Sequence, residues 1–360
     1  MSKKTTEKRK YYDFFEDVKK FPDAVVYLVV SLRSVGKTYS FLKDCYQQGI
    51  KCIYMKRTID DVETICTGDE FSDINPYKPI NRDIKSNIKP KLLRKGVGYF
   101  KQVDKDENAQ FVAYLAALNS LKTIRGVDFS DADYCVLDET CPTLGDLSIR
   151  HNEGEQLMDC YLTFNRDRED RGLDPIKLVL FSNSDNVICP IYETLEIVNP
   201  LVDLAASGEA YYYDPERLIM IHYITDKEIP PTEAQKKRGM YRTMLGTDWH
   251  AKAYSAAFVH NDFSKVTKKS IAHARCLMKC TYNHKDIYIY ENQDNGALIF
   301  TDRKHQVRTK YDFSIEGDRV RFLHYENQFV RNAIMNDKAH FETFTMYDLF
   351  FNFTKKFNLR

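Results

Sequence analysis

The amino-acid sequence predicts an α/β protein whose mostly parallel sheet has helices on both faces, followed by a smaller α+β C-terminal domain. Over the first 200 residues, apolar segments of strand length alternate with helical segments, the order that builds a parallel sheet. Residues 200–250 change in composition and contain Tyr211-Tyr212-Tyr213 and Pro230-Pro231. From about residue 270, short strands follow one another directly. We therefore expect a first domain over residues 1–200, a linker or small helical subdomain over 201–265, and a C-terminal domain over 266–360.

The first strand leads into a sequence that is typical of a phosphate-binding loop. Residues 25–31 are an apolar run, and a short loop then reaches Gly36-Lys37-Thr38, where a helix to about residue 48 begins. In this context Lys37 would reach the β- and γ-phosphates of a nucleotide, and the Thr38 hydroxyl would hold Mg²⁺. Backbone N–H groups of the loop would surround the phosphates. The expected binding residues are Ser31, Ser34, Val35, Gly36, Lys37 and Thr38, although Ser31 stands where the strict pattern has glycine.

A second motif follows about 100 residues later. Tyr134 to Leu137 form a short apolar strand, and Asp138 and Glu139 follow it directly. Ligands of parallel sheets bind outside the carboxyl ends of the strands, so both motifs are expected at one edge. Asp138 would complete the Mg²⁺ site, and Glu139 would orient or deprotonate a water that attacks the γ-phosphate. The two motifs predict a P-loop NTPase of the ASCE type that uses ATP and Mg²⁺, and the acidic pair favours hydrolysis over binding alone.

The remaining elements complete this plan. A second strand over 50–58 ends in basic residues, and residues 60–95 form an irregular insertion with short helices. Strands over 98–103 and 110–115 form a hairpin, a helix covers about 153–168, and an apolar strand covers 177–183. In the C-terminal domain we expect strands over 274–282, 286–291 and 297–302, then helices near 325–335 and 345–357. A meander followed by helices is how a ribonuclease-H-like domain begins.

Composition restricts the class of protein. The chain has 360 residues, 43% hydrophobic and 29% charged, and no stretch approaches the ~20 apolar residues that cross a bilayer. Nine cysteines without a Cys-x-x-Cys pair, and a basic polar start over residues 1–10, indicate a reduced cytosolic protein without a secretion signal. The net charge of +1 hides an asymmetry, because residues 251–360 carry 18 Lys and Arg against 12 Asp and Glu. A basic C-terminal part favours a nucleic-acid partner.

With these motifs, the chain resembles the DNA-packaging ATPases of φ29-like bacteriophages, which are relatives of the large terminase subunits. Motors of this kind carry an arginine in the P-loop, which Arg33 matches, and a coupling motif after the next strand, which Ser182-Asn183-Ser184 matches. The resemblance implies that Asn183 contacts the γ-phosphate or the attacking water. It also implies a ring of five subunits, in which one subunit supplies a cation to its neighbour's site. The candidates for that cation are Lys122, Arg125, Arg166 and Arg168.

The resemblance further implies partners and a location. Double-stranded DNA, other copies of the chain, the phage portal on the procapsid and a structural RNA are the expected partners, in the host cytoplasm and without a membrane. Terminase nucleases hold two metal ions with a carboxylate cluster, but the first C-terminal strand here has no acid. Asp302 and Asp337 are the acids expected near such a site, and two scattered acids hold metal ions poorly, so we expect nucleic-acid binding without cleavage. A terminase with an active nuclease, a small-molecule nucleotide kinase and a non-catalytic nucleic-acid scaffold are the alternatives.

Overall fold

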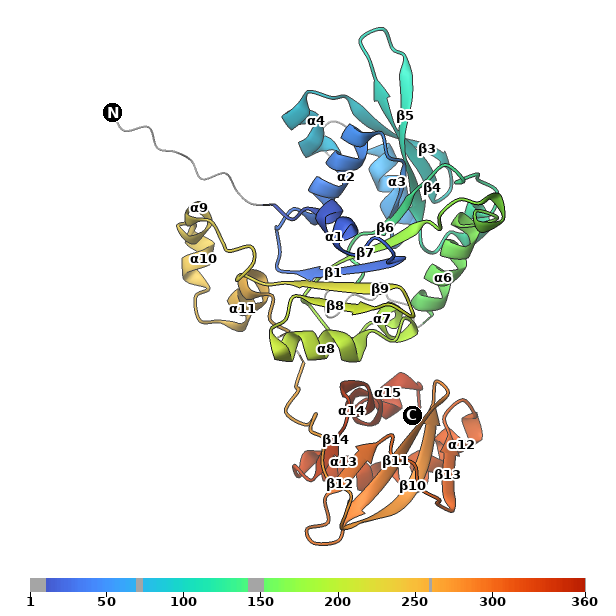
Figure 1. Cartoon of the computed structure of the whole chain (residues 1–360), viewed down its shortest axis with the longest axis vertical. Helices are drawn as coiled ribbons and strands as arrows, with labels where there is room; N and C mark the ends of the chain where they lie inside the picture. Colours follow the sequence, from blue (N-terminus) through green and yellow to red (C-terminus); the bar gives the residue numbers. More distant parts are fainter. Residues whose placement is uncertain (1–10, 69–73, 142–151, 259–260, 360) are drawn as a thin grey trace. The chain divides into compact units, whose positions relative to one another are not determined.

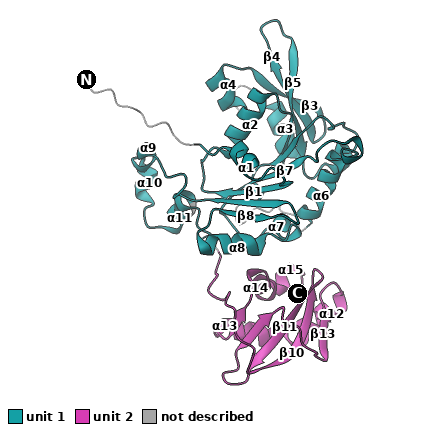
Figure 2. Cartoon of the chain, viewed as in Figure 1, with its two compact units in different colours: residues 1–260 teal, residues 261–360 magenta. Residues whose placement is uncertain are grey.

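The computed structural model describes residues 11–68, 74–141, 152–258 and 261–359. The chain divides into two compact units, residues 1–260 and 261–360 (Figure 2). The basic stretch over residues 1–10 lies outside the described residues. Within them, no helix is both long enough and apolar enough to span a membrane.

The first unit is built around a nine-stranded sheet, which confirms the α/β class. The strand order is β3-β4-β5-β2-β6-β7-β1-β9-β8. The six central strands, from β5 to β9 in this order, run parallel, and β3, β4 and β8 join antiparallel at the two ends. The strand bounds are β1 Val26–Ser31, β2 Cys52–Lys56, β3 Ile88–Arg94, β4 Val97–Val103, β5 Ala109–Ala117, β6 Tyr134–Leu137, β7 Lys177–Asn183, β8 Tyr211–Asp214 and β9 Ile219–Ile224.

Helices cover both faces of this sheet. Figure 1 shows α1 and α2 on one side of β1 and β7, and α7 and α8 on the other. α2 begins after Gly36 and ends at Gly49, and both glycines have a left-handed backbone, as the ends of this helix require. α3 begins with a capping box between Thr58 and Asp61. The helix bounds are α1 Phe14–Lys20, α2 Lys37–Gln48, α3 Ile59–Thr67, α4 Lys78–Ile84, α5 Leu121–Ile124, α6 Glu153–Phe164, α7 Pro190–Thr194 and α8 Val198–Ser207.

The expected linker over residues 201–265 does not fit this architecture. α8 packs next to β8 and β9, and β9 pairs in parallel with β1 at the centre of the sheet. β9 is buried along its whole length, so its apolar residues belong to the core of the first unit. The expected helical part lies after β9, with α9 Glu233–Lys236, α10 Gly239–Thr243 and α11 Asp248–Ser255. The tyrosine-rich composition that suggested a linker is that of an antiparallel strand at the edge of the sheet.

The second unit has a five-stranded sheet in the order β13-β10-β11-β12-β14, with four helices. The expected meander is present as β10, β11 and β12, which pair antiparallel in turn. Buried phenylalanines from strands and helices fill its core, including Phe300, Phe313, Phe322 and Phe341. The bounds are β10 Ala274–Tyr282, β11 Lys285–Asn292, β12 Leu298–Thr301, β13 Thr309–Asp312, α12 Glu316–Tyr325, α13 Asn327–Met335, β14 Ala339–Phe341, α14 Phe344–Phe351 and α15 Phe353–Lys356.

Candidate functional site

Polar side chains converge where four neighbouring parallel strands of the first unit end. In the sheet, β2, β6, β7 and β1 lie side by side and point the same way. Ser31 at the end of β1 is in register with Asn183 at the end of β7. Asp138 and Glu139 follow the last residue of β6. The two sequence motifs, 100 residues apart, therefore meet at the carboxyl edge of the sheet, where open α/β sheets bind ligands.

Lys37 is a buried cation at the centre of this edge. Its Nζ donates to Ser31 Oγ at 2.6 Å and to Asn183 Oδ1 at 3.2 Å. Only 9% of the residue is exposed. Desolvation lowers the pKa of Lys37 to about 8, although the negative charge of Asp138 acts in the opposite direction. An anion placed beside the ammonium group would therefore be strongly attracted, because the protein itself compensates this charge poorly.

Thr38 and Asp138 form an oxygen-rich pair beside Lys37. The Thr38 hydroxyl donates to Asp138 Oδ1 at 2.9 Å, and the Tyr54 hydroxyl donates to Asp138 Oδ2 at 3.0 Å. Asp138 is thus held from two sides, by α2 and by β2. Hydroxyl and carboxylate oxygens are the donors that Mg²⁺ prefers, so this pair fits the predicted metal ligands.

Glu139 points out of the sheet. Its backbone is left-handed, with φ of 59°, which is uncommon for a residue with a side chain. Its side chain is 70% exposed, and Oε2 lies 3.9 Å from the Nζ of Lys56, the last residue of β2. The neighbouring Thr140 is fully buried and donates its backbone N–H to Phe181 O. Glu139 is therefore an exposed carboxylate between two residues that are fixed to the sheet.

The loop between β1 and α2 contains the other expected binding residues. Ser31 is the end of β1 and keeps an ordinary backbone, whereas the left-handed residues are Ser34 (φ 65°) and Gly36 (φ 85°). The missing glycine at position 31 thus removes no required conformation. Val35 is buried, and its carbonyl accepts from the backbone N–H of Tyr12. α2 begins without a side-chain cap, which leaves its N-terminal end suited to an anion.

Arg33 is the exposed cation of this loop. Its Nη2 lies 3.4 Å from Asp185 Oδ2, and nearly half of the side chain is accessible while Asp185 is buried. Asp185 follows β7 two residues after Asn183, so the pair links the loop to the end of β7, where the coupling motif is expected. A partly exposed arginine held at one end of its guanidinium can still face a ligand with its other N–H groups.

The four cations considered for action across subunits lie in different environments. Arg168 is buried, and its guanidinium donates to the carbonyls of Ser130, Ala132 and Asp174. It therefore fixes the chain before β6, at the edge opposite to Asp138, and its burial makes it the least suitable of the four candidates for action across subunits. Arg166, two residues earlier, is exposed.

Lys122 and Arg125 come from a different part of the chain. Lys122 lies on α5, Arg125 directly follows it, and both are exposed. α5 follows β5, which runs parallel to β2, so these residues lie toward the same edge as the site.

Three residues that border the site were not predicted from the sequence, and they lie on β2 or directly after it. Tyr54 holds Asp138, Lys56 faces Glu139, and Arg57 donates through Nη2 to the carbonyls of Glu139 and Thr140. The sequence contained a signal for the two basic residues, because the second strand ends in basic residues and the ends of parallel strands meet at one edge of the sheet. What the sequence lacked was the strand order that makes β2 the direct neighbour of β6.

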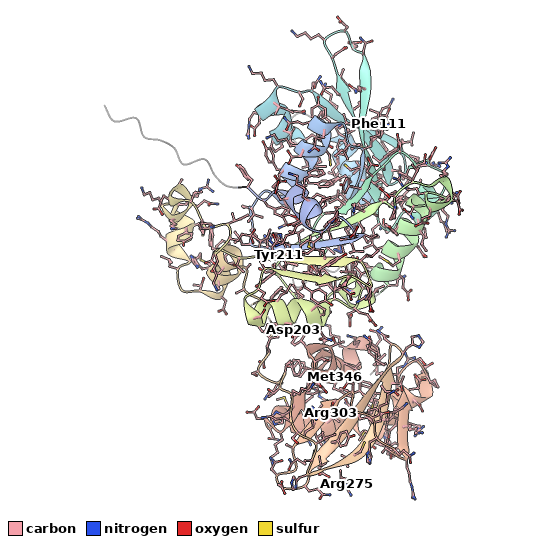
Figure 3. The ribbon with its side chains drawn as sticks, viewed as in Figure 1. Phe111, Asp203, Tyr211, Arg275, Arg303 and Met346 are labelled. Carbon is pink, nitrogen blue, oxygen red and sulfur yellow. The ribbon has the colours of Figure 1, made fainter. Side chains whose placement is uncertain are left out.

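A second buried polar cluster is centred on His222 and adjoins the loop between β1 and α2. His222 of β9 is 2% exposed, with Nδ1 at 2.8 Å from Asp17 Oδ2 and Nε2 at 3.0 Å from Glu228 Oε2. Tyr12 donates to Asp17 at 2.6 Å, and the ring of Tyr211, labelled in Figure 3, stacks on the imidazole. Because Tyr12 also donates to the loop carbonyl of Val35, the cluster ties α1 and β9 to the loop.

Comparisons with known proteins give the fold of the whole chain. No known family model matches the sequence, and no curated protein does. A structure described as the Phi-28 gp11 DNA packaging motor is 14% identical, with a TM-score of 0.60, and the match covers 98% of this chain and 99% of that chain. The bacteriophage Phi-29 viral genome packaging motor assembly is 14% identical, with a TM-score of 0.63 and coverages of 97% and 99%. This chain therefore shares its fold, over nearly its whole length, with the DNA packaging motors of Phi-28 and Phi-29.

Proposed function

We propose that this chain is an ATPase that drives double-stranded viral DNA into a procapsid as a subunit of a homo-oligomeric ring. The observation that carries the proposal is the meeting of Lys37, Thr38, Asp138, Glu139 and Asn183 at one sheet edge. The full-length similarity of fold to two packaging motors supports the same function over that of a small-molecule kinase.

The loop residues would bind the triphosphate of ATP. Lys37 exchanges its contacts with Ser31 and Asn183 for oxygens of the β- and γ-phosphates, which supply the charge that its buried site lacks. Thr38 and Asp138 would hold Mg²⁺, which would offset the negative charge that develops on the phosphates. Tyr54 keeps Asp138 oriented while Thr38 turns toward the metal.

Hydrolysis would depend on Glu139. Its exposed carboxylate accepts a hydrogen bond from a water and aligns it with the γ-phosphate, a contribution typically worth about 10²–10⁴ in rate. Asn183 loses its contact with Lys37 when nucleotide enters and then contacts the γ-phosphate or the water. Loss of the γ-phosphate thus changes contacts at the end of β7, which begins the conformational step.

Cations would stabilise the negative charge of the transferring phosphate. Arg33 is available from the same chain, and Lys122 or Arg166 of a neighbour is exposed as a residue acting between subunits must be. Such a cation can raise the rate by about 10³–10⁵. A closed ring, of five subunits in our proposal, brings Lys122 or Arg166 of each copy to the site on the next copy.

The second unit would hold DNA without cutting it. Its excess of basic residues favours phosphate contacts, which suit a motor that must ignore sequence. The order β12-β11-β10-β13 supports a ribonuclease-H-like domain. Asp302 follows the end of β12, whereas Asp337 precedes β14, which runs parallel to β12. These acids lie at opposite ends of neighbouring strands and are too far apart to share a metal pair.

The ring would act in the host cytoplasm and bind the portal of a procapsid, with a structural RNA as a further partner. The first test is ATP hydrolysis by the purified chain, with and without double-stranded DNA, over a range of protein concentrations. We expect turnover to rise with both DNA and concentration, because assembly brings the neighbour's cation. Turnover that ignores DNA, with phosphate passed to a metabolite, would favour a kinase.

A single substitution tests the proposed role of Glu139. Glu139→Gln should bind Mg-ATP with unchanged affinity and hydrolyse it about 10²–10⁴ times more slowly. Glu107→Gln is the matched control, since Glu107 is also exposed and left-handed, with φ of 63°, but lies in the β4–β5 turn. Normal turnover by the Glu139 variant would remove this carboxylate from the mechanism.

A further inference from the structure

We propose that Arg57 is a positioning residue that fixes the direction of the Glu139 side chain. Arg57 follows β2 and is largely buried, with 11% of its side chain exposed. Its Nη2 donates to the carbonyl of Glu139 at 3.0 Å and to that of Thr140 at 3.1 Å. Its Nη1 lies 3.0 and 3.2 Å from the two carboxylate oxygens of Glu153. One guanidinium thus joins the chain after β6 to the first turn of α6.

The backbone around Glu139 needs such a clamp. A left-handed conformation is unfavourable for glutamate and persists only where the surroundings determine it. On one side, Asp138 is held by Thr38 and Tyr54. On the other side, Thr140 donates its N–H to Phe181 O and its hydroxyl to Leu137 O. The carbonyl of Glu139 lies between these anchors, and its partner is Arg57.

The choice of residue follows from this geometry. Only arginine has a planar group with five donors, which can serve two carbonyls and a carboxylate at once. Glu153 is 3% exposed, so its charge also depends on Arg57. Lysine at position 57 could satisfy one of these partners but not all of them. The Arg57–Glu153 pair therefore sets the position of the backbone from which the Glu139 carboxylate extends.

This inference rests on the proposed ATPase function, in which a small displacement of Glu139 misaligns the water. A shift of about 1 Å at a reacting group can cost about 10²-fold in rate. Arg57→Met should lower kcat by about tenfold to a hundredfold, while KM and the affinity for Mg-ADP stay within about twofold. Arg57→Lys should recover part of kcat.

Because Arg57→Met removes the positive charge beside the buried carboxylate of Glu153, a second variant is needed. In Arg57→Met/Glu153→Met both charges are gone, so this double variant should fold and yet remain as slow as Arg57→Met. Arg168→Met is the matched control. Arg168 is another buried arginine that donates to carbonyls of the same β6 segment, but at its other end. Its substitution should lower the melting temperature and leave kcat of the folded protein unchanged.

A second readout separates this inference from the proposed function. Amide hydrogen exchange over residues 138–141 should become about tenfold faster in the double variant and stay unchanged in Arg168→Met. If the wild-type protein hydrolyses no ATP with DNA, the proposed function fails while the exchange data still test the clamp. Recovery of wild-type kcat by the double variant, or unchanged exchange at residues 138–141, would overturn the positioning role of Arg57.

Discussion

Burial of Lys37 predicts that nucleotide binding takes up a proton. In the free protein, desolvation lowers the pKa of Lys37 from its ordinary 10.5 to about 8, against the opposing influence of Asp138. Phosphate oxygens beside the ammonium group restore the missing negative charge and raise this pKa again. Above pH 8, Lys37 is therefore mostly neutral before binding and charged afterwards. The proton that it gains must come from the solution.

The number of protons taken up follows from the pKa values of Lys37 before and after nucleotide binding. At pH 8 about half of the free protein carries neutral Lys37, and at pH 9 about nine tenths does, so binding takes up about 0.5 and 0.9 protons. The apparent Kd for Mg-ATP should therefore rise about tenfold between pH 7 and pH 9. The same lowered pKa destabilises the fold by about 3 kcal/mol below pH 8, where Lys37 is charged in both states. This cost is lost as the pH rises from 8 to 10.5, so the free energy of unfolding gains from this group over that range.

Calorimetric titration of the protein with Mg-ATP measures this uptake directly. At one pH, the apparent binding enthalpy should vary with the ionisation enthalpy of the buffer, and the slope gives the number of protons. Glu139→Gln prevents hydrolysis during the titration and leaves Lys37 in place. An enthalpy that is independent of the buffer at pH 8.5, together with a Kd that is flat from pH 7 to 9, would refute the argument.

Two further predictions concern the loop and the cluster behind it. Gly36→Ala should lower the free energy of unfolding by about 1–2 kcal/mol and weaken Mg-ATP binding, because φ is +85° and a Cβ would meet the Tyr11 ring at 2.6 Å. Gly49→Ala is the control at the other end of α2, where φ is +69° and nothing lies within reach of a Cβ. It should lower the melting temperature without weakening Mg-ATP binding. For His222, burial lowers the pKa but Asp17 and its second carboxylate partner raise it above the usual value. The difference in unfolding free energy between the wild-type protein and His222→Gln should be largest below pH 6.5 and fall as the pH rises through the pKa of the folded protein. Denaturant titrations measure both unfolding free energies. If the difference between the wild-type protein and His222→Gln grew with pH, the raised pKa of His222 would be contradicted.

The sequence predicted those parts of the candidate site whose residues are neighbours along the chain. The loop before α2 and the acidic pair after β6 are each contiguous, and each carries its own context of strand and turn. Parallel strands bring their carboxyl ends to one edge, so the meeting of Lys37 with Asp138 followed from the pattern. The left-handed backbone of Ser34 did not, because serine gives no signal for this conformation.

The linker shows where local composition misleads. Tyr211 to Tyr213 and the prolines near residue 230 suggested a connection between domains, but β9 is buried in the middle of the first unit. A strand that pairs with β1 from nearly 200 residues away has no local mark of its partner, because the pairing energy comes from contacts distant in sequence.

The amino-acid sequence by itself determined which residues we propose for the chemistry, since a turn of the phosphate-binding type and an acidic strand end are short motifs that can be read locally. Only the tertiary structure decided which other side chains support them. Tyr54, Lys56 and Arg57 border the site because β2 lies next to β6. Arg168 does not border it, because its buried guanidinium donates to backbone carbonyls at the opposite edge of the sheet. Strand order and burial are products of the whole fold, so no window of sequence contains them.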